Sequence, residues 1–133
     1  MRLEWEDKKA IDNVSEAQLR YRLGRKRGGD TSHVILDSGD GGYIQMLGGG
    51  VACCLEWRDA KRRRHFRAFL NPPRVPWKEP ALLGSMKLSP SEFLFIEAVV
   101  ESFCAFLGGR PFPAQVHWRD VTAELVAAGV EAP

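Results

Sequence analysis

The side chains that most often bind metal ions are scattered along this chain. His33, His65 and His117 occur singly, and no two of them have the spacing that places two ligands on one helix face or one hairpin. We therefore interpret them as ordinary surface or core histidines. The sequence predicts no metal site and no cofactor.

The three cysteines show no sign of a reactive or paired thiol. Cys53 and Cys54 are adjacent, Cys104 is distant, and no CxxC spacing is present. Adjacent residues of a strand point to opposite faces, which makes a bridge between them awkward. An activated thiolate needs a neighbouring base, and the sequence offers no local sign of one. We expect buried thiols that pack as small apolar residues, in a reducing compartment.

Two further patterns suggest catalysis only superficially. Gly48-Gly49-Gly50 is followed by neither a helix start nor the lysine of a phosphate loop, so it is typical of a hairpin. Glu97 and Glu101 have the spacing of a carboxylate pair, but the wet side of an amphipathic helix explains them better. No nucleophile elbow accompanies the serines either. We predict that the chain is not an enzyme.

A basic cluster is the best candidate for a binding function. Residues 61–67 hold five cations in seven positions. We predict partner contacts through the exposed side of two neighbouring strands and their turn, because arginine forks make several directed hydrogen bonds at interfaces. The predicted contact residues are Arg58, Arg62, Arg63, Arg64, Arg67, Tyr43 and Gln45. The alternative is a solvated turn without a binding role.

A second basic region comprises Arg20, Arg22, Arg25, Lys26 and Arg27. If both regions lie on one side, they form a patch able to meet phosphates or a carboxylate-rich protein. The net charge is only +2, from 19 Lys and Arg against 17 Asp and Glu. This value favours a protein partner and argues against general phosphate affinity. A small nucleic-acid-binding protein using residues 61–67 is the alternative function.

Four short strands, punctuated by glycine-bearing or charged turns, must position the first cluster. They span residues 34–37, 43–47, 51–57 and 64–70, and the pattern predicts an antiparallel meander sheet of four to five strands. The alternation of Val51, Cys53, Leu55 and Trp57 indicates a core face, with Trp57 in a structural role. On the last strand we expect a packed face opposite a basic, wetter one that carries Arg67.

Helices complete an α+β fold. A capping-box pattern at Ser15 predicts a short helix that ends at Gly28-Gly29. A second pattern at Ser89 predicts a long amphipathic helix as far as Leu107, packed on one face of the sheet. We expect a further short helix from Thr122.

The segment before that last helix, residues 116–121, is predicted to be a last short strand or extended segment with a structural role. Trp118 is predicted to be buried, and Asp120 to hold nearby backbone or a cation. The whole chain, 1–133, is predicted to be one domain with an N-terminal arm (1–14), a Pro-rich loop (71–88) and a frayed tail (126–133). Neither a signal peptide nor an apolar run of ~20 residues is present, so we expect no membrane contact and a cytoplasmic location.

The order of these features resembles the small immunity proteins of bacterial polymorphic-toxin systems, in particular the family that includes inhibitors of secreted deaminase toxins. The similar segments are Ser32–Leu36, Gly41–Gln45, Val51–Trp57, Arg64–Ala68, the helix Ser89–Leu107 and the closing Trp118–Thr122. The resemblance covers roughly residues 15 to 123. The Pro-rich stretch 71–80 has no counterpart in it.

This resemblance implies a function through binding. Such proteins are not enzymes; they bind one cognate toxin domain in the cell that makes it and commonly cover its active site. We therefore expect an immunity protein that forms a 1:1 complex with a bacterial toxin, for which the family suggests a deaminase that targets nucleic acid. Salt distinguishes this function from the alternative, because phosphate-driven binding weakens steeply with ionic strength.

Overall fold

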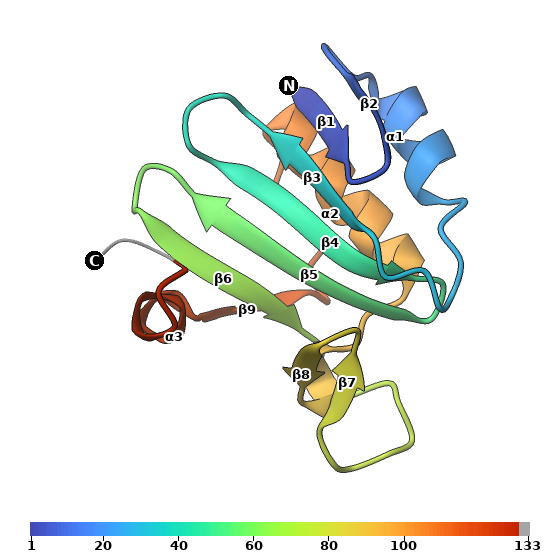
Figure 1. Cartoon of the computed structure of the whole chain (residues 1–133), viewed down its shortest axis with the longest axis vertical. Coiled ribbons are helices and arrows are strands. Elements are labelled where there is room, and N and C mark those ends of the chain that lie inside the picture. Colours follow the sequence, from blue (N-terminus) through green and yellow to red (C-terminus); the bar gives the residue numbers. More distant parts are fainter. Residues whose placement is uncertain (131–133) are drawn as a thin grey trace.

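The computed structural model describes residues 1–130, which form an α+β fold (Figure 1). Seven strands build one antiparallel sheet in the order β2-β1-β3-β4-β5-β6-β9. They are β1 (Arg2–Trp5), β2 (Lys8–Ile11), β3 (His33–Asp37), β4 (Tyr43–Gly49), β5 (Ala52–Asp59), β6 (Arg64–Phe69) and β9 (His117–Asp120). The helices are α1 (Glu16–Leu23), α2 (Ile96–Gly108) and α3 (Thr122–Ala127).

The predicted meander is present as β3 to β6, but the sheet is larger than the four or five strands expected. Residues 1–14, predicted as an arm, contain the hairpin β1–β2, and β1 pairs with β3 through Leu3 and Leu36. At the other edge, the short strand or extended segment expected over residues 116–121 is present as β9, which pairs with β6 and places Trp118 opposite Ala68. The added strands have four residues each, and in β1 only Leu3 is buried. Such short segments give no clear alternation of apolar residues.

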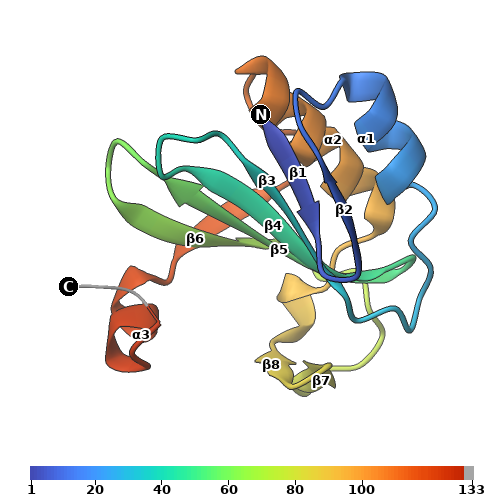
Figure 2. The same cartoon turned by 45° about the horizontal axis from the view of Figure 1, so that its top comes forward.

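Both faces of the sheet are covered, by different elements. Helices α1 and α2 pack on one face, while α3 and the small hairpin β7–β8 lie on the other side (Figure 2). The larger core joins the sheet to α1 and α2 through residues that include Leu36, Ile44, Leu55, Leu19 and Phe103. The smaller core lies under the hairpin and comprises Leu47, Cys54, Leu83, Leu88 and Phe93.

This double coverage explains why β5 is buried on both sides. Cys53 and Leu55 face the larger core as predicted, and Cys54 faces the smaller one. Burial raises the pKa of the Cys53 thiol to about 12. Val51 was expected in the core but lies in the β4–β5 turn, where 67% of it is exposed.

The long helix begins later than the sequence indicates. The capping box at Ser89 and Glu92 is formed, but it opens a short 3-10 turn, η1 (Pro90–Glu92). Leu94 then exchanges two backbone hydrogen bonds with Cys53, at 2.9 and 2.8 Å, which holds the chain extended beside β5. Helix α2 starts only at Ile96 and ends at Gly108, where the C-cap residue Gly109 has a left-handed φ of 64°.

Part of the segment predicted as a Pro-rich loop, and the first two residues of the predicted tail, belong to regular elements. Residues 71–88 contain β7 (Ala81–Leu83) and β8 (Met86–Leu88), which pair with each other. In the tail predicted for 126–133, residues 126 and 127 close α3, and residues 131–133 lie outside the described part. Among the described helices, none has the length and apolar character needed to cross a membrane.

Candidate partner-binding surface

The structure divides the seven predicted contact residues into two groups. Tyr43, Gln45, Arg58 and Arg67 lie on one sheet face, because the register pairs Tyr43 with Arg58 and places both Gln45 and Arg67 opposite Glu56. The second group belongs to the turn between β5 and β6 and the start of β6, and comprises Arg62, Arg63 and Arg64. Only this second group is well exposed.

Glu56 is the centre of the sheet-face group. Only 5% of Glu56 is exposed, and its carboxylate accepts hydrogen bonds from Gln45 (2.8 Å) and Arg67 Nε (2.9 Å), with His65 Nε2 at 3.2 Å. Burial alone would raise the pKa of this carboxyl. The hydrogen bond with His65 and the charge of Arg67 outweigh burial and lower the pKa to about 2. Glu56 is therefore ionised throughout the physiological range.

Arg67 is an internal residue of this network. Its side chain is 11% exposed, and besides Glu56 it faces Glu92 of η1, with Nη1 3.6 Å from Oε2. Arg119 of β9 reaches the same Glu92 oxygen at 3.0 Å. The expectation of a wet face around Arg67 is thus wrong. Its carboxylate partners are Glu56 of the neighbouring strand and Glu92 of a turn that is distant in the sequence, and no local sequence pattern predicts such pairs.

The turn arginines differ from one another in their partners. Arg62 Nε lies 2.6 Å from Asp59 Oδ2, and its guanidinium carbon sits 4.9 Å from the centroid of the Phe66 ring. Arg64 Nε lies 3.0 Å from Asp120. Arg63 is exposed, has a left-handed φ of 55°, and has no ion pair with any residue in 1–130. The cluster is therefore partly neutralised by its own chain.

Asp120 and Trp118 hold the β9 edge. Asp120 accepts a hydrogen bond from the Thr122 backbone N–H (2.9 Å) and pairs with Arg64, and these contacts lower its pKa. Trp118 is partly exposed rather than fully buried, and its ring packs edge-on against Trp57 at a centroid distance of 5.6 Å. Trp57 also contacts Phe112 at 5.0 Å. Aromatic rings from β5, β9 and the segment after α2 thus form one cluster.

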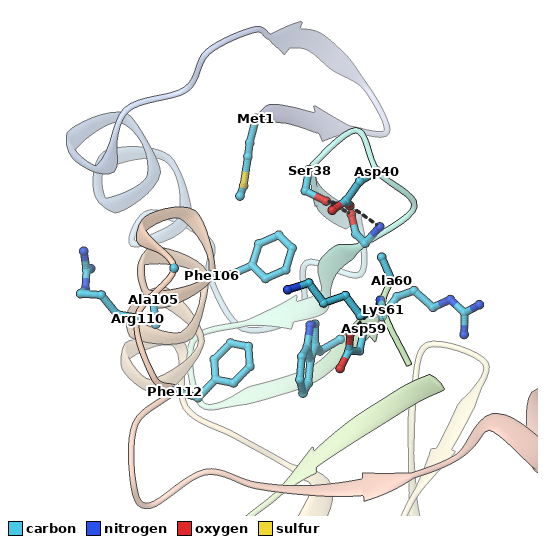
Figure 3. A pocket seen from close by; sticks show the side chains of 14 residues that line it. Met1, Ser38, Asp40, Asp59, Ala60, Lys61, Ala105, Phe106, Arg110 and Phe112 are labelled. Atoms are coloured by element: carbon cyan, nitrogen blue, oxygen red, sulfur yellow. Dashed lines mark hydrogen bonds between the residues drawn. The ribbon is translucent and has the colours of Figure 1, made fainter. Parts of the chain in front are cut away.

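This cluster borders a cavity of about 290 Å³ beside the β5–β6 turn (Figure 3). Trp57, Phe106 and Phe112 supply aromatic walls, and the side chain of Lys61 extends across the cavity towards Phe106. Asp40 lies at the opposite loop, where hydrogen bonds from Ser38 and the Gly42 backbone lower its pKa. The sequence did not indicate this cavity, because its walls come from four segments that meet only in the fold.

No protein-family model matches the chain, and no curated protein matches it.

The arrangement is suited to recognition. Within residues 1–130, no group of three His, Cys, Asp or Glu side chains is placed to hold a metal ion. The buried carboxylate Glu56 is occupied by its partners, and the thiol pKa values of Cys53 and Cys54 are raised by burial, which disfavours thiolates. What reaches the solvent at this end is an aromatic cavity next to guanidinium groups.

Proposed function

We propose that this chain is an immunity protein that binds a cognate bacterial toxin domain in a 1:1 complex and covers its active site in the cytoplasm. The observation that carries the proposal is the aromatic cavity of about 290 Å³ directly beside the exposed arginine turn. Protein interfaces concentrate their binding energy where an apolar pocket is surrounded by polar groups, and aromatic and arginine side chains dominate such sites. The resemblance of the strand and helix order to toxin inhibitors supports the same function.

The contact surface we propose is narrower than the predicted set. Arg62 and Arg63 project from the turn, next to Lys61 at the cavity. Arg62 is held by Asp59 and the Phe66 ring, so little side-chain entropy is lost when it binds. Arg67 serves as the support of this surface, because its charge is used inside the sheet face.

Binding to nucleic acid is less consistent with the charge pairs. A phosphate backbone is attracted by cations that lack other partners, and Arg62, Arg64 and Arg67 each face a carboxylate of this chain. The alternative function would need those pairs to open. We therefore retain the toxin-binding function as the main proposal, with the deaminase activity of the toxin as the activity the resemblance implies.

The test is to examine the neighbouring genes for one that encodes a toxin domain and to co-express that domain with the chain. We expect the chain to restore growth, and light scattering after gel filtration to give a 1:1 complex that persists at high salt. The pair of substitutions Arg62→Glu and Arg63→Glu should abolish rescue without lowering Tm much. Lys78→Glu with Lys87→Glu makes the same change of net charge in the 71–88 segment and should leave rescue intact. Failure of rescue by the unmodified chain, or salt-sensitive binding to single-stranded nucleic acid alone, would overturn the proposal.

A further inference from the structure

A second cavity, of about 240 Å³, lies between the β1–β2 hairpin and α1. Two aromatic side chains, Trp5 and Tyr21, line it together with the cations Lys8, Arg22 and Arg25. This part of the fold is remote from the β5–β6 turn, since α1 and β2 lie at the opposite edge of the sheet (Figures 1 and 2). The two basic regions of the sequence therefore do not form one patch.

The charge of this cavity is not balanced by the chain itself. A fourth cation, Lys26, is buried and neutralised, with Nζ 3.1 Å from Asp30 and a hydrogen bond to Ser32. Within residues 1–130, no carboxylate lies at ion-pair distance from Lys8, Arg22 or Arg25. Asp30 also lines the cavity, but its carboxylate is paired with Lys26, so four cations and one carboxylate leave an excess of three positive charges around this space.

The aromatic rings hold part of this charge in place before any ligand arrives. The Arg25 guanidinium carbon lies 4.9 Å from the centroid of Tyr21, and the Lys8 ammonium lies 4.8 Å from that of Trp5. Cation–π contacts of this kind orient the cations and reduce the entropy lost on binding. Tyr21 is 62% exposed, so its ring remains open to contact with a ligand as well as with Arg25.

We propose that this cavity binds a carboxylate-rich segment of a protein partner. The proposal deepens the function proposed above and rests on it for the identity of that partner, namely the toxin. Guanidinium and ammonium groups converging on one space match carboxylates, and the two rings offer apolar area to the segment that carries them.

The surroundings of the cavity favour a protein over a phosphate polymer. Carboxylates flank it along the chain: Glu6 and Asp7 precede β2, Asp12 follows it, and Glu16 opens α1. Three of them are paired within the chain, Glu6 with His33, Asp12 with Arg2 and Glu16 with Arg110. Among the four, Asp7 therefore contributes most of the repulsion, which acts over roughly 8 Å at physiological salt. A nucleic acid carries a charge on every unit and would meet this repulsion on leaving the cavity. A folded protein can present a few carboxylates into the cavity alone.

The probe is a capped triglutamate, an oligoglutamate short enough to keep its carboxylates at the cavity, titrated into the full chain and followed by amide NMR at low salt. We expect saturable shifts at β2 and α1, and none with oligoglutamine of the same length. The combined substitutions Lys8→Glu, Arg22→Glu and Arg25→Glu should weaken binding by about tenfold or more, as expected when three charged contacts are lost. The control Arg74→Glu, Lys78→Glu and Lys87→Glu changes the net charge equally and should retain binding.

Each outcome decides one of the two proposals. The cavity proposal is overturned if oligoglutamate gives no saturable shifts, or if oligodeoxythymidylate binds the same residues more tightly. If the unmodified chain rescues cells from the toxin and the triple variant rescues them equally well, the cavity does not contact the toxin, although the immunity function stands. If oligoglutamate binds but no toxin is neutralised, the immunity function fails while the cavity remains a site for acidic segments.

Discussion

The two basic regions of this molecule differ in what their cations face. On the sheet and turn around β5 and β6, Arg62, Arg64 and Arg67 are each paired with a carboxylate of the same chain. Around the cavity between β2 and α1, Lys8 and Arg25 rest on aromatic rings and have no carboxylate partner within residues 1–130. The cations around β5 and β6 are thus mostly paired within the chain, whereas those between β2 and α1 keep their charge available to a partner.

The difference shows why a run of cations is a poor guide to a binding site. A buried guanidinium must be paired, since an isolated charge in the interior is very costly. Arg67 is therefore paired with Glu56 and Glu92, because β6 lies between β5 and β9 and its side chain is largely buried. Cations at the edge of the fold have no such requirement. Their charge remains available to a partner, and variants in the two regions should behave differently.

The largest contrast is expected between Arg67 and Arg63. The Arg67 side chain is only 11% exposed, so Arg67→Glu would place a third carboxylate beside Glu56 and Glu92 in the interior. Breaking a buried ion pair in this way should lower the free energy of unfolding by about 3–5 kcal/mol. Arg63→Glu changes an exposed turn residue and should leave the free energy of unfolding nearly unchanged. Urea denaturation of both variants measures the difference. Equal, small effects would show that the Glu56 network contributes little.

The same network predicts a dependence of stability on pH. The pKa of Glu56 is about 2 in the folded protein against an ordinary value of 4.5, so the folded state binds this proton less readily than the unfolded state does. The stabilisation is present above pH 4.5 and is lost as the pH falls through the folded pKa; its size is about 3 kcal/mol. Denaturation at a series of acidic pH values should show this loss. In Glu56→Gln, this part of the pH dependence should be absent.

Much of the sheet could be predicted from the sequence, because its evidence is local. The glycine-punctuated alternation from residue 34 to 70 specifies β3 to β6, and the capping boxes at Ser15 and Ser89 are formed as expected. The hairpin β1–β2 could not be predicted, since four residues with at most one buried side chain form a strand only when a neighbouring strand is already there; β9, by contrast, was expected as a short strand or extended segment. The start of α2 was misplaced because Leu94 is held extended by Cys53, a long-range contact.

The candidate site was less predictable than the fold. The composition of 61–67 identified the arginines but not their partners, because Glu56, Glu92 and Asp120 come from other parts of the chain. The two cavities are likewise lined by segments that are distant in sequence. A signal for the second one was visible in Tyr21, an aromatic residue on a helix whose apolar stripe is thin.

A smaller effect is expected from the aromatic cluster that supports the turn. Trp118→Ala removes ring contacts with Trp57 and Phe112 but starts from a partly exposed side chain, so the loss should be about 2–3 kcal/mol, below that of a fully buried tryptophan. Calorimetry gives the change, and Trp77→Ala is the matched control on the β7–β8 side, where the ring is 41% exposed and contacts Phe93. A loss near zero for Trp118→Ala would mean that the cluster does not brace the turn.

The smallest changes in stability are expected when the unpaired cations between β2 and α1 are removed. Lys8→Gln, Arg22→Gln and Arg25→Gln together remove three cations that have no carboxylate partner, so Tm should change by no more than about 2 °C. Arg62→Gln with Arg64→Gln removes two surface ion pairs and should lower Tm by about 2–4 °C. Scanning calorimetry at low and high salt compares them. Salt screens exposed ion pairs, so the loss of Tm in the Arg62/Arg64 double variant should be smaller at high salt. The Tm of the triple variant should depend little on salt. If the triple variant were instead the more strongly destabilised, the cations around Trp5 and Tyr21 would be structural, and the contrast between the two regions would not hold.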